Sequence, residues 1–281
     1  MKHYASIEAL LKTGAHFGHL TRRWNPKMEP FIFTEKNGIH IIDLRKTQLL
    51  IDLARDAAFD IATKGRNFLF VGTKSQAKGS IEEIAQKCGS NYVAERWLGG
   101  MLTNFATIRK SIKRLESIDK MSVDGTYEKI TKKERLLLDR EKERLRKVFG
   151  GIEDMTRLPG AIVIVDILKE HLAIAEAHIL GIPVIALVDS NADPHQVDYP
   201  IPANDDSIGT IELIGGILAD AINEGKEIAK SRMAESKGVE AMTQKVESTE
   251  SSEEPKIKRK MRKRKTSDDE QEVEETSEEN N

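Results

Sequence analysis

The sequence has little of what secreted proteins and membrane proteins usually contain. Only one cysteine, Cys88, occurs among 281 residues, so no disulfide can form within the chain. Its place near the end of an amphipathic segment (80–88) indicates a small buried hydrophobic side chain rather than a nucleophile. No apolar run approaches the length of a membrane span, and the first residues lead into a capped helix instead of a signal peptide. We therefore expect a cytoplasmic protein with no membrane partner.

Aromatic residues are also scarce. They make up 5% of the chain, whereas charged residues make up 32%. This balance suits a solvated surface or a polyanionic partner better than an aromatic-lined ligand cavity. The formal net charge of −2 does not exclude nucleic acid, because it averages over segments of opposite sign. The distribution of charge along the chain therefore matters more than its sum.

The glycine patterns that bind nucleotides are missing. Residues 70–79 (FVGTKSQAKG) occupy the strand, loop and helix start where a doubly wound protein would hold a phosphate. They contain neither the three-glycine dinucleotide fingerprint nor a Walker sequence. Lys74 and Lys78 could still meet a phosphate at a helix N-terminus, and that phosphate could belong to a nucleic-acid backbone or to a nucleotide. We expect no cofactor and no small-molecule substrate.

Candidate metal ligands are present but have no diagnostic spacing. Two histidines and four aspartates lie in loops, several of them at strand ends: His16, His19, Asp189, Asp193, Asp205 and Asp206. Aspartates in such loops also cap helices and form turns, as Asp206 or Ser207 would do before the last helix. Spacing alone therefore supports a metal site or an acid–base pair poorly. We predict no metal ion and no catalytic residue.

The chain does contain a regular alternation of apolar strands and amphipathic helices. Strands are predicted at 68–72, 91–93, 161–165 and 183–188. A helical pattern follows each of them: around Ile81, from about Thr103, at 169–180, and at 208–229 after a loop. Nearly continuous apolar strands that alternate with helices indicate a parallel sheet covered on both faces. The predicted fold class is α/β, with a doubly wound parallel sheet.

A different pattern precedes this alternation. Ser6 can cap a short helix at 7–12, and a loop follows at 15–27. Two short apolar runs, 31–33 and 39–42, flank Asn37-Gly38, which is a strong hairpin signal. The next helix is predicted at 47–63, with its apolar residues on one face.

Between the strands at 91–93 and 161–165 the chain carries a long insertion. Ile108, Ile112, Leu115 and Ile118 form one narrow apolar stripe, and Thr131 with Glu134 fits a capping box that opens a return helix. Residues 107–149 hold fourteen basic and eight acidic residues. The pattern predicts an antiparallel coiled-coil hairpin whose positive faces are either a solvated surface or a surface for a large anion.

The predicted domains follow from these patterns. A discontinuous α/β domain comprises residues 1–105 and 151–233, and the inserted hairpin comprises 106–150. Residues 234–281 form a charged tail that we expect to be disordered. Its segment 255–265 holds eight basic residues and 266–281 holds eight acidic ones. The basic block could contact phosphates or could fold back onto its acidic neighbour.

Several blocks of sequence carry a resemblance to a known family. They stand in the same order as in that family, between about residues 6 and 230: AHFGH (15–19), RWNPKM (23–28), FVGTK (70–74), ERWLGGMLTNF (95–105), DSNADP (189–194) and IPANDD (201–206). On these blocks the chain resembles the S-two family of small-subunit ribosomal proteins in bacteria. The tail lies outside the resemblance.

The resemblance implies a fold, a function and partners. It implies a flavodoxin- or Rossmann-like domain with an inserted coiled-coil hairpin, bound to small-subunit rRNA at the junction of head and body. It also implies contact with other small-subunit proteins, including recruitment of the large mRNA-binding S-one protein, and no catalysis. A protein in this role is ribosome-bound in the cytoplasm and supports translation.

Recognition of folded rRNA depends on phosphates, ribose hydroxyls and shape, so we expect positioning contacts from basic and polar side chains. The predicted rRNA-binding residues are Arg22, Arg23, Trp24, Asn25, Lys27, Lys74, Lys78, Arg96, Trp97, Asn104, Arg109, Lys110, Lys113 and Arg114. The two tryptophans could stack on a base or ribose, but we favour the interpretation that each anchors its loop to the domain.

Two other functions fit parts of the same sequence. A cytoplasmic nucleotide- or NAD-binding enzyme could use the same fold, and a stability gain from ATP, flavin or nicotinamide would reveal it. A coiled-coil adaptor that binds protein could use the same hairpin, and binding that is insensitive to salt would favour it over an RNA contact.

Overall fold

The structure is a computed structural model that describes residues 3–125, 127 and 130–250; the side chains of 235–250 are outside the description. The chain divides into two units, Met1–Lys230 and Ser231–Asn281. The first unit contains all of the strands described below. No helix among the described residues is both long enough and apolar enough to span a bilayer.

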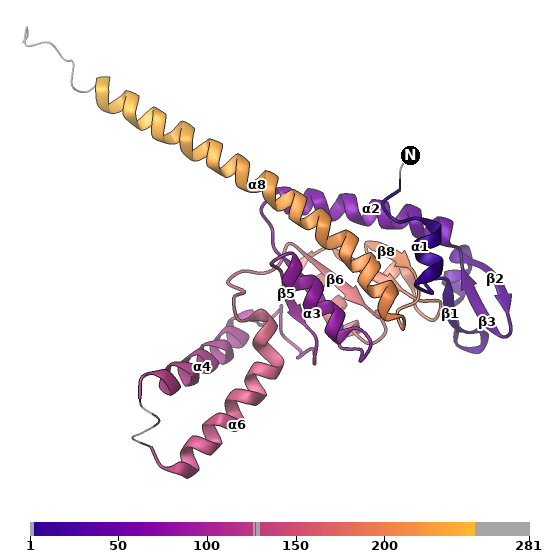
Figure 1. The fold of residues 1–281 in the computed structure, drawn as a ribbon, viewed down its shortest axis with the longest axis horizontal. Helices are drawn as coiled ribbons and strands as arrows, with labels where there is room; N and C mark the ends of the chain where they lie inside the picture. Colours follow the sequence, from indigo (N-terminus) through magenta and orange to yellow (C-terminus); the bar gives the residue numbers. More distant parts are fainter. Residues whose placement is uncertain (1–2, 126, 128–129, 251–281) are drawn as a thin grey trace, which may run out of the picture. The chain divides into compact units, whose positions relative to one another are not determined.

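The centre of the first unit is a parallel sheet of five strands (Figure 1). In chain order the strands are β4 (Phe68–Val71), β5 (Asn91–Val93), β6 (Ala161–Val165), β7 (Val184–Val188) and β8 (Tyr199–Pro202). Their order across the sheet is β5-β4-β6-β7-β8, which is the flavodoxin-like order of doubly wound proteins. The predicted α/β fold with a parallel sheet is confirmed.

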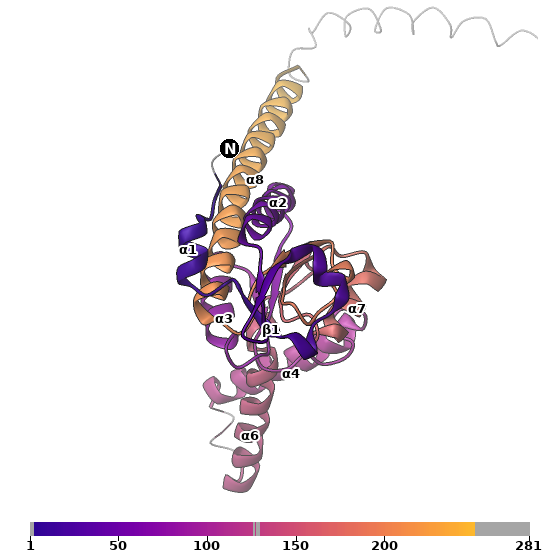
Figure 2. The same ribbon diagram turned by 90° about the vertical axis from the view of Figure 1, so that its right-hand side faces the viewer.

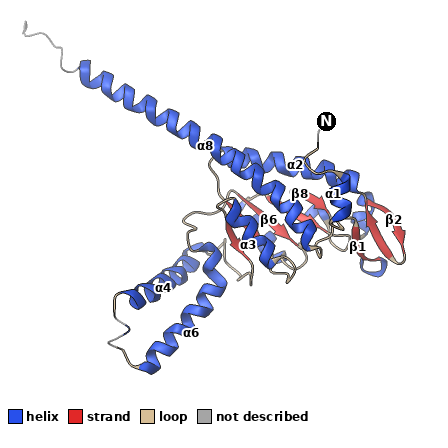
Figure 3. Ribbon diagram, viewed as in Figure 1, coloured by secondary structure: helices blue, strands red, loops and turns tan. Residues whose placement is uncertain are grey.

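The apolar runs of the strands serve two cores, because successive side chains point to opposite faces. Phe68 and Phe70 of β4 belong to one core, whereas Leu69 and Val71 belong to the other. Every residue of β4, β6 and β7 is buried. Both faces are covered by helices, and Figure 3 shows α3 and α8 in front of the strands on one of them.

The helices divide between the two faces (Figure 2). One face packs against α1 (Ile7–Lys12), α2 (Leu44–Thr63), α3 (Lys78–Lys87) and the first part of α8 (Ile208–Glu250). The other face packs against α7 (His171–Leu180), the start of α4 (Phe105–Val123) and the segment between β5 and α4. Cys88 is buried in the first core, as its sequence context predicted.

A separate antiparallel sheet of three strands lies before α2. It consists of β1 (Phe17–Leu20), β2 (Ile32–Lys36) and β3 (Ile39–Ile42), in the order β1-β3-β2. Asn37 and Gly38 both have positive φ angles, which a tight hairpin turn requires, so the hairpin prediction is confirmed. The prediction of a loop at 15–27 is wrong: the segment contains β1, the 3-10 turn η1 (Thr21–Arg23) and the start of a second 3-10 turn, η2 (Pro26–Phe31).

Two further elements differ from the sequence prediction. β8 was not predicted, because Pro200 and Pro202 argue against a strand; it forms at the edge of the sheet, where proline is tolerated. Helix α8 ends at Glu250 rather than near Ala229. The residues that follow Ala229 are rich in Ala, Glu, Lys and Met, which have high helix propensity. Residues 251–281, with both charge blocks, lie outside the described residues, so disorder of the tail stays a prediction.

Two helices, α4 and α6 (Lys132–Phe149), lie side by side in the insertion, and we call this pair the arm (Figure 1). The stripe Ile108, Ile112, Leu115 and Ile118 is buried, and the capping box of Thr131 and Glu134 is present. Ion pairs join the helices; one of them links Arg114 to Glu141 at 3.0 Å. The short helix η3 (Gly150–Ile152) leads back to the sheet. Classification of the arm as an inserted coiled coil, and the domain boundaries, stay predictions.

Candidate nucleic-acid interface

The place where this fold usually binds a ligand is filled by the protein's own carboxylates. In a doubly wound sheet that place is the crevice at the carboxyl ends of the strands where the strand order reverses, which here is between β4 and β6. Thr73 follows β4, and both its N–H and its hydroxyl donate to Oε1 of Glu170, at 2.8 and 2.6 Å. Glu170 is buried, and burial raises the pKa of its carboxyl. The two donors of Thr73 are therefore already used and are not available to a phosphate.

Lys74 lies in the same crevice and is surrounded by acid. Its ammonium group is 2.6 Å from Asp205 and from Asp206, and 3.5 Å from Asp166. Burial alone would lower the pKa of Lys74, but the hydrogen bonds that its ammonium group donates to Asp205 and Asp206 outweigh burial and raise the pKa. Burial and the neighbouring carboxylates of Asp189 and Asp166 raise the pKa of Asp205 to about 7. Lys74 therefore serves the fold; the prediction that it contacts rRNA is untested.

One group in this region has the atoms that a metal site needs. Ligand atoms of His19, Asp205 and Asp206 all lie within 4.8 Å of one another. The ring of His19 is 3.0 Å from Asp189, and the hydrogen bond to that carboxylate raises the pKa of His19. The ammonium group of Lys74 already lies against both aspartates. The arrangement is a compact network of ion pairs in which histidine and lysine supply the positive charge. His16 does not take part in it.

The loop that leads into the arm is wrapped around one buried carboxylate. Glu176 of α7 accepts hydrogen bonds from Trp97 Nε1 at 3.0 Å and from the N–H groups of Gly100, Leu102 and Thr103 at 2.7 to 3.0 Å. Burial favours the protonated form of Glu176, but these hydrogen bonds outweigh burial and lower its pKa. Gly100 has a φ of 88°, a conformation that suits glycine. This network fixes the start of α4.

Trp97 anchors this loop to the domain, as we expected from the sequence. Its side chain is buried, with 6% exposure, inside the second core. Stacking of its ring on RNA would require the loop to leave Glu176. Trp24 is half-buried and lies against the ring of His40, with centroids 4.8 Å apart. It is therefore also packed against the protein.

The segment around Trp24 is held to the loop after β7. The N–H of Asn25 donates to the carbonyl of Ser190 at 2.8 Å, and the Asn25 side chain caps η2. Lys27 pairs with Asp193 at 2.6 Å, and this lysine lowers the pKa of the Asp193 carboxyl. Arg22 and Arg23 are exposed, with no ion pair or side-chain hydrogen bond to a described residue. Of these residues, the two arginines are the ones available to a ligand.

The predicted residues of α4 also divide into used and available side chains. Arg109 donates to the carbonyl of Met155 at 3.0 Å, and Arg114 holds Glu141 through two hydrogen bonds. Lys110 and Lys113 are exposed and have no ion pair or side-chain hydrogen bond to any described residue. Arg96 and Asn104 are exposed on the loop before the helix. The structure therefore leaves two adjacent lysines of the arm free for an anion.

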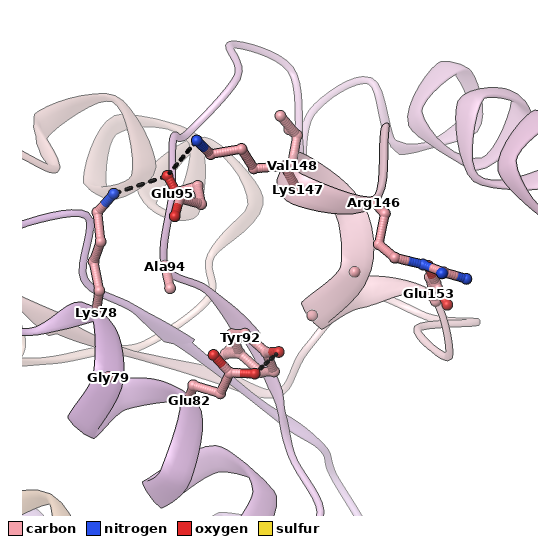
Figure 4. Close-up of a pocket in the computed structure, with 12 residues that line it drawn as sticks. Lys78, Gly79, Glu82, Tyr92, Ala94, Glu95, Arg146, Lys147, Val148 and Glu153 are labelled. Carbon is pink, nitrogen blue, oxygen red and sulfur yellow. Dashed lines mark hydrogen bonds and ion pairs between the residues drawn. The ribbon is translucent and has the colours of Figure 1, made fainter. Parts of the chain in front are cut away.

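A polar pocket of about 490 Å³ lies where the arm meets α3 (Figure 4). Glu95 stands between two lysines in it: Lys78 of α3 at 2.8 Å and Lys147 of α6 at 3.8 Å. Lys78 and Lys147 both help to lower the pKa of Glu95, with the hydrogen bond from Lys78 the larger effect. Lys78 is thus engaged by a carboxylate at the base of the arm.

Sequence reasoning did not find the two residues that organise this region. Glu170 and Glu176 look like ordinary polar positions of a helix, and nothing local shows that they point at loops about 70 to 100 residues earlier in the chain. The predicted binding residues fall in three places: the segment 22–27, the carboxyl end of β4 with the start of α3, and the stretch from Arg96 to Arg114.

Comparison with known proteins gives a consistent result. The family model described as Ribosomal protein S2 matches residues 10–225. A protein of Chloroherpeton thalassium is 62% identical over 224 residues, which cover 80% of this chain and 90% of the relative. One from Chlorobium phaeovibrioides is 56% identical and covers 85% and 95%, and one from Salinibacter ruber is 52% identical and covers 84% and 73%. Each relative is named small ribosomal subunit protein uS2.

Proposed function

The chain belongs to the ribosomal protein S2 family, and from this premise we propose that it binds small-subunit rRNA through its arm and the exposed loops at the strand ends. The family makes it a structural protein of the small ribosomal subunit that serves translation, and not an enzyme. The proposal adds the rRNA contact, its position at the junction of head and body, a cytoplasmic location, and docking of the S-one protein.

The observation that carries the rRNA proposal is the pair Lys110 and Lys113. Both are exposed on one face of α4 and neither has a described ionic partner, whereas carboxylates hold four other predicted cations, Lys27, Lys74, Lys78 and Arg114. Lysines that are not needed for folding are available to phosphates, and each phosphate contact releases counterions from RNA. The contacts at Arg22, Arg23 and Arg96 rest on the same argument.

The crevice between β4 and β6 speaks against the nucleotide-binding alternative. Glu170 takes the backbone and hydroxyl donors of Thr73, and three aspartates surround Lys74. A nucleotide phosphate would have to displace both sets of contacts and would bring more negative charge next to buried carboxylates, which is unfavourable. A structural role in a ribonucleoprotein does not require a free phosphate-binding site in this crevice.

An exposed apolar surface supports docking of a protein such as S-one. Ile7 and Leu11 of α1 and Phe33 of β2 line a groove of about 340 Å³, and Phe33 is 73% exposed. Solvent-exposed apolar side chains that gather in a groove are typical of protein interaction sites. This surface is separate from the free lysines of α4, so one protein could contact RNA and protein at the same time.

The test of the rRNA proposal uses the double variant Lys110→Glu/Lys113→Glu. We expect binding of the full-length variant to a small-subunit rRNA transcript to weaken, with the slope of log K against log salt reduced by about two, because each phosphate contact contributes about one. Thermal unfolding should be unchanged, since the two lysines hold no described partner.

The matched control is Lys12→Glu/Lys64→Glu, which makes the same change of charge at exposed lysines outside the arm. It should keep the wild-type slope. Equal slopes for the α4 variant and the wild type would remove these lysines from the proposal. Binding of wild-type protein that does not depend on salt would contradict the rRNA contact itself and favour an adaptor that binds protein.

A further inference from the structure

Helix α7 has an outer face that is apolar. Leu172, Ala175 and Ile179 are exposed on it and lie within about 60° of one another around the helix axis, at about 100° per residue. The exposed fraction is 48% for Leu172 and 75% for Ile179. Leu168 is 47% exposed and lies in the turn just before the helix. We call these four residues the α7 stripe.

The outer face of α7 differs from that of another helix of the same length. Both α7 and α3 contain ten residues. α3 presents charged side chains to solvent, among them Glu82, Glu83 and Lys87. α7 buries Ile174 and Ala177 on its inner side and is also apolar on its outer side. A helix that is apolar all round is normally buried on every side, so the α7 stripe is suited to a partner.

The spacing of the α7 stripe indicates that this partner is an α-helix. Its members follow one another at intervals of four, three and four residues. This is the spacing of a coiled-coil seam, in which apolar side chains recur every 3.5 residues on average. A facing helix with the same spacing can insert its side chains between those of the stripe. A partner strand would need the open edge of a sheet, which a helix does not offer.

The length of the α7 stripe argues against a second copy of this chain as the partner. From Leu168 to Ile179 the stripe extends about 17 Å, or three helical turns. A stable complex buries about 800 Å² on each partner, and four side chains supply only a part of that. A neighbouring protein in the small ribosomal subunit needs less from the stripe, because its other contacts within the particle hold it nearby.

The residues beside the α7 stripe indicate the charge of the partner helix. All ten residues of α7 are described, and its exposed ones include no Asp, Glu, Lys or Arg. Its one carboxylate, Glu176, is buried and holds the loop before α4. His171 and His178 are exposed along one edge of the stripe, two turns apart. A carboxylate beside an imidazole favours its charged form and gains an ion pair. A helix with acidic residues along its flank therefore suits this face.

We infer that the α7 stripe docks an amphipathic α-helix with acidic flanks that belongs to another protein of the small ribosomal subunit. The inference goes beyond the proposed rRNA contact. It requires only that the chain belongs to the subunit, which its family shows. α7 and α1 cover opposite faces of the parallel sheet (Figure 2), so this helix and a protein in the groove beside α1 can bind together.

The first test is crosslinking inside the assembled particle. The photoreactive amino acid p-benzoylphenylalanine replaces Ile179 in the full-length protein, and purified small subunits that carry it are irradiated. We expect a crosslink to one small-subunit protein, in a segment that contains acidic residues and apolar residues at intervals of three and four. The same probe at Leu53 of α2, which is 59% exposed, is the control and should not give this crosslink. A crosslink only to rRNA, only to a peptide of this chain, or to nothing would overturn the inference.

The second test is competition of Leu172→Gln/Ile179→Gln with the wild type for incorporation into small subunits. We expect the share of the variant in gradient-purified subunits to fall about tenfold, because two apolar side chains lose their burial against the partner. The control is Leu49→Gln/Leu53→Gln on α2, whose side chains are 54% and 59% exposed. It should be incorporated like the wild type. Thermal unfolding and the salt slope of rRNA binding should be the same in all three proteins.

Equal incorporation of Leu172→Gln/Ile179→Gln and the wild type would overturn the inference, and so would equal losses for the α7 and α2 variants. In either case salt-dependent rRNA binding by the wild type would leave the proposed function standing. Conversely, the expected crosslink in a protein that binds no rRNA on its own would support the α7 stripe and contradict the proposed rRNA contact.

Discussion

The largely buried lysine in the crevice of the parallel sheet differs from the exposed lysines of the arm in what it contacts. In the crevice, Lys74 is 14% exposed and lies within reach of three carboxylates. On the arm, Lys110 and Lys113 are exposed and have no ion pair to a described residue, whereas Arg114, Lys142 and Arg146 are paired. Counting lysines in the sequence would make both regions candidate phosphate sites. The ion pairs of the lysines distinguish the two regions, because a paired cation stabilises the fold and an unpaired one is available to a ligand.

The loop that connects the parallel sheet to the arm fixes the position at which the arm begins. Glu176 gathers the backbone of the segment from Gly100 to Thr103 and so sets where α4 starts. The arm therefore begins from a fixed point on the core. Rigid support of this kind matters for a contact with folded RNA, which is recognised by shape.

The largest effect that we expect comes from Glu176→Ala. The substitution leaves the indole N–H of Trp97 and three backbone N–H groups without their acceptor, and should lower the free energy of unfolding by about 4 kcal/mol. Urea unfolding measures it, with Glu143→Ala as the exposed control. A loss under about 1 kcal/mol would show that the loop has other support.

Lys74→Met should have the next largest effect, a loss of about 3 kcal/mol near pH 8, because it leaves buried carboxylates without their cation. The pKa of Asp205 is already raised to about 7. A carboxyl with a raised pKa stabilises the fold at low pH and loses this contribution as pH rises through about 7. Loss of Lys74 raises this pKa further, so the variant should be less impaired at pH 5 than at pH 8.

The control for that experiment is Lys78→Met. Lys78 and its partner Glu95 are both about one-third exposed, so the pair is screened and should contribute under about 1 kcal/mol. Unfolding in urea at both pH values compares the two variants. Equal losses for Lys74→Met and Lys78→Met would erase the distinction between a buried and an exposed cation on which the comparison depends.

Arg114→Ala should have a smaller effect, about 1 kcal/mol or less, because it removes one exposed bidentate pair with Glu141. This variant compares a paired and an unpaired cation within the arm, because Arg114 binds Glu141 and Lys113 has no described partner. Thermal unfolding of Arg114→Ala against Lys113→Ala measures the difference. A midpoint for Lys113→Ala as low as that for Arg114→Ala would mean that the unpaired lysine also supports the fold.

Nucleotides are expected to have no effect on the stability of the protein. ATP and NAD should not raise the unfolding midpoint, because a ligand raises it only if it binds the folded state, and the donors of Thr73 are held by Glu170. Differential scanning fluorimetry at millimolar ligand tests this. A midpoint that rises with nucleotide concentration would reopen the crevice as a binding site.

Much of the fold followed from the sequence, because the apolar runs of β4, β6 and β7 and the turn at Asn37-Gly38 are local signals. β8 did not, since its two prolines are acceptable only at an edge, and an edge is a property of the finished sheet. The stop of α8 was also misplaced, because a run of strong helix formers continues beyond the last apolar position.

The candidate site was less accessible to sequence reasoning. Basic residues can be counted, but the partner of each is set by contacts between distant segments, such as Lys74 with Asp205 or Arg109 with the carbonyl of Met155. For the same reason the sequence did not distinguish the paired Arg114 from the free Lys113. The apolar seam of the arm could be predicted because it repeats with the helix period; the sorting of its charges could not.

A density map of the small ribosomal subunit with this protein bound tests the central claim most directly. The account predicts rRNA phosphates within hydrogen-bonding distance of Lys110 and Lys113, with Lys74 still held by Asp205 and Asp206. A map in which those two lysines face solvent while a phosphate lies against Lys74 would contradict it.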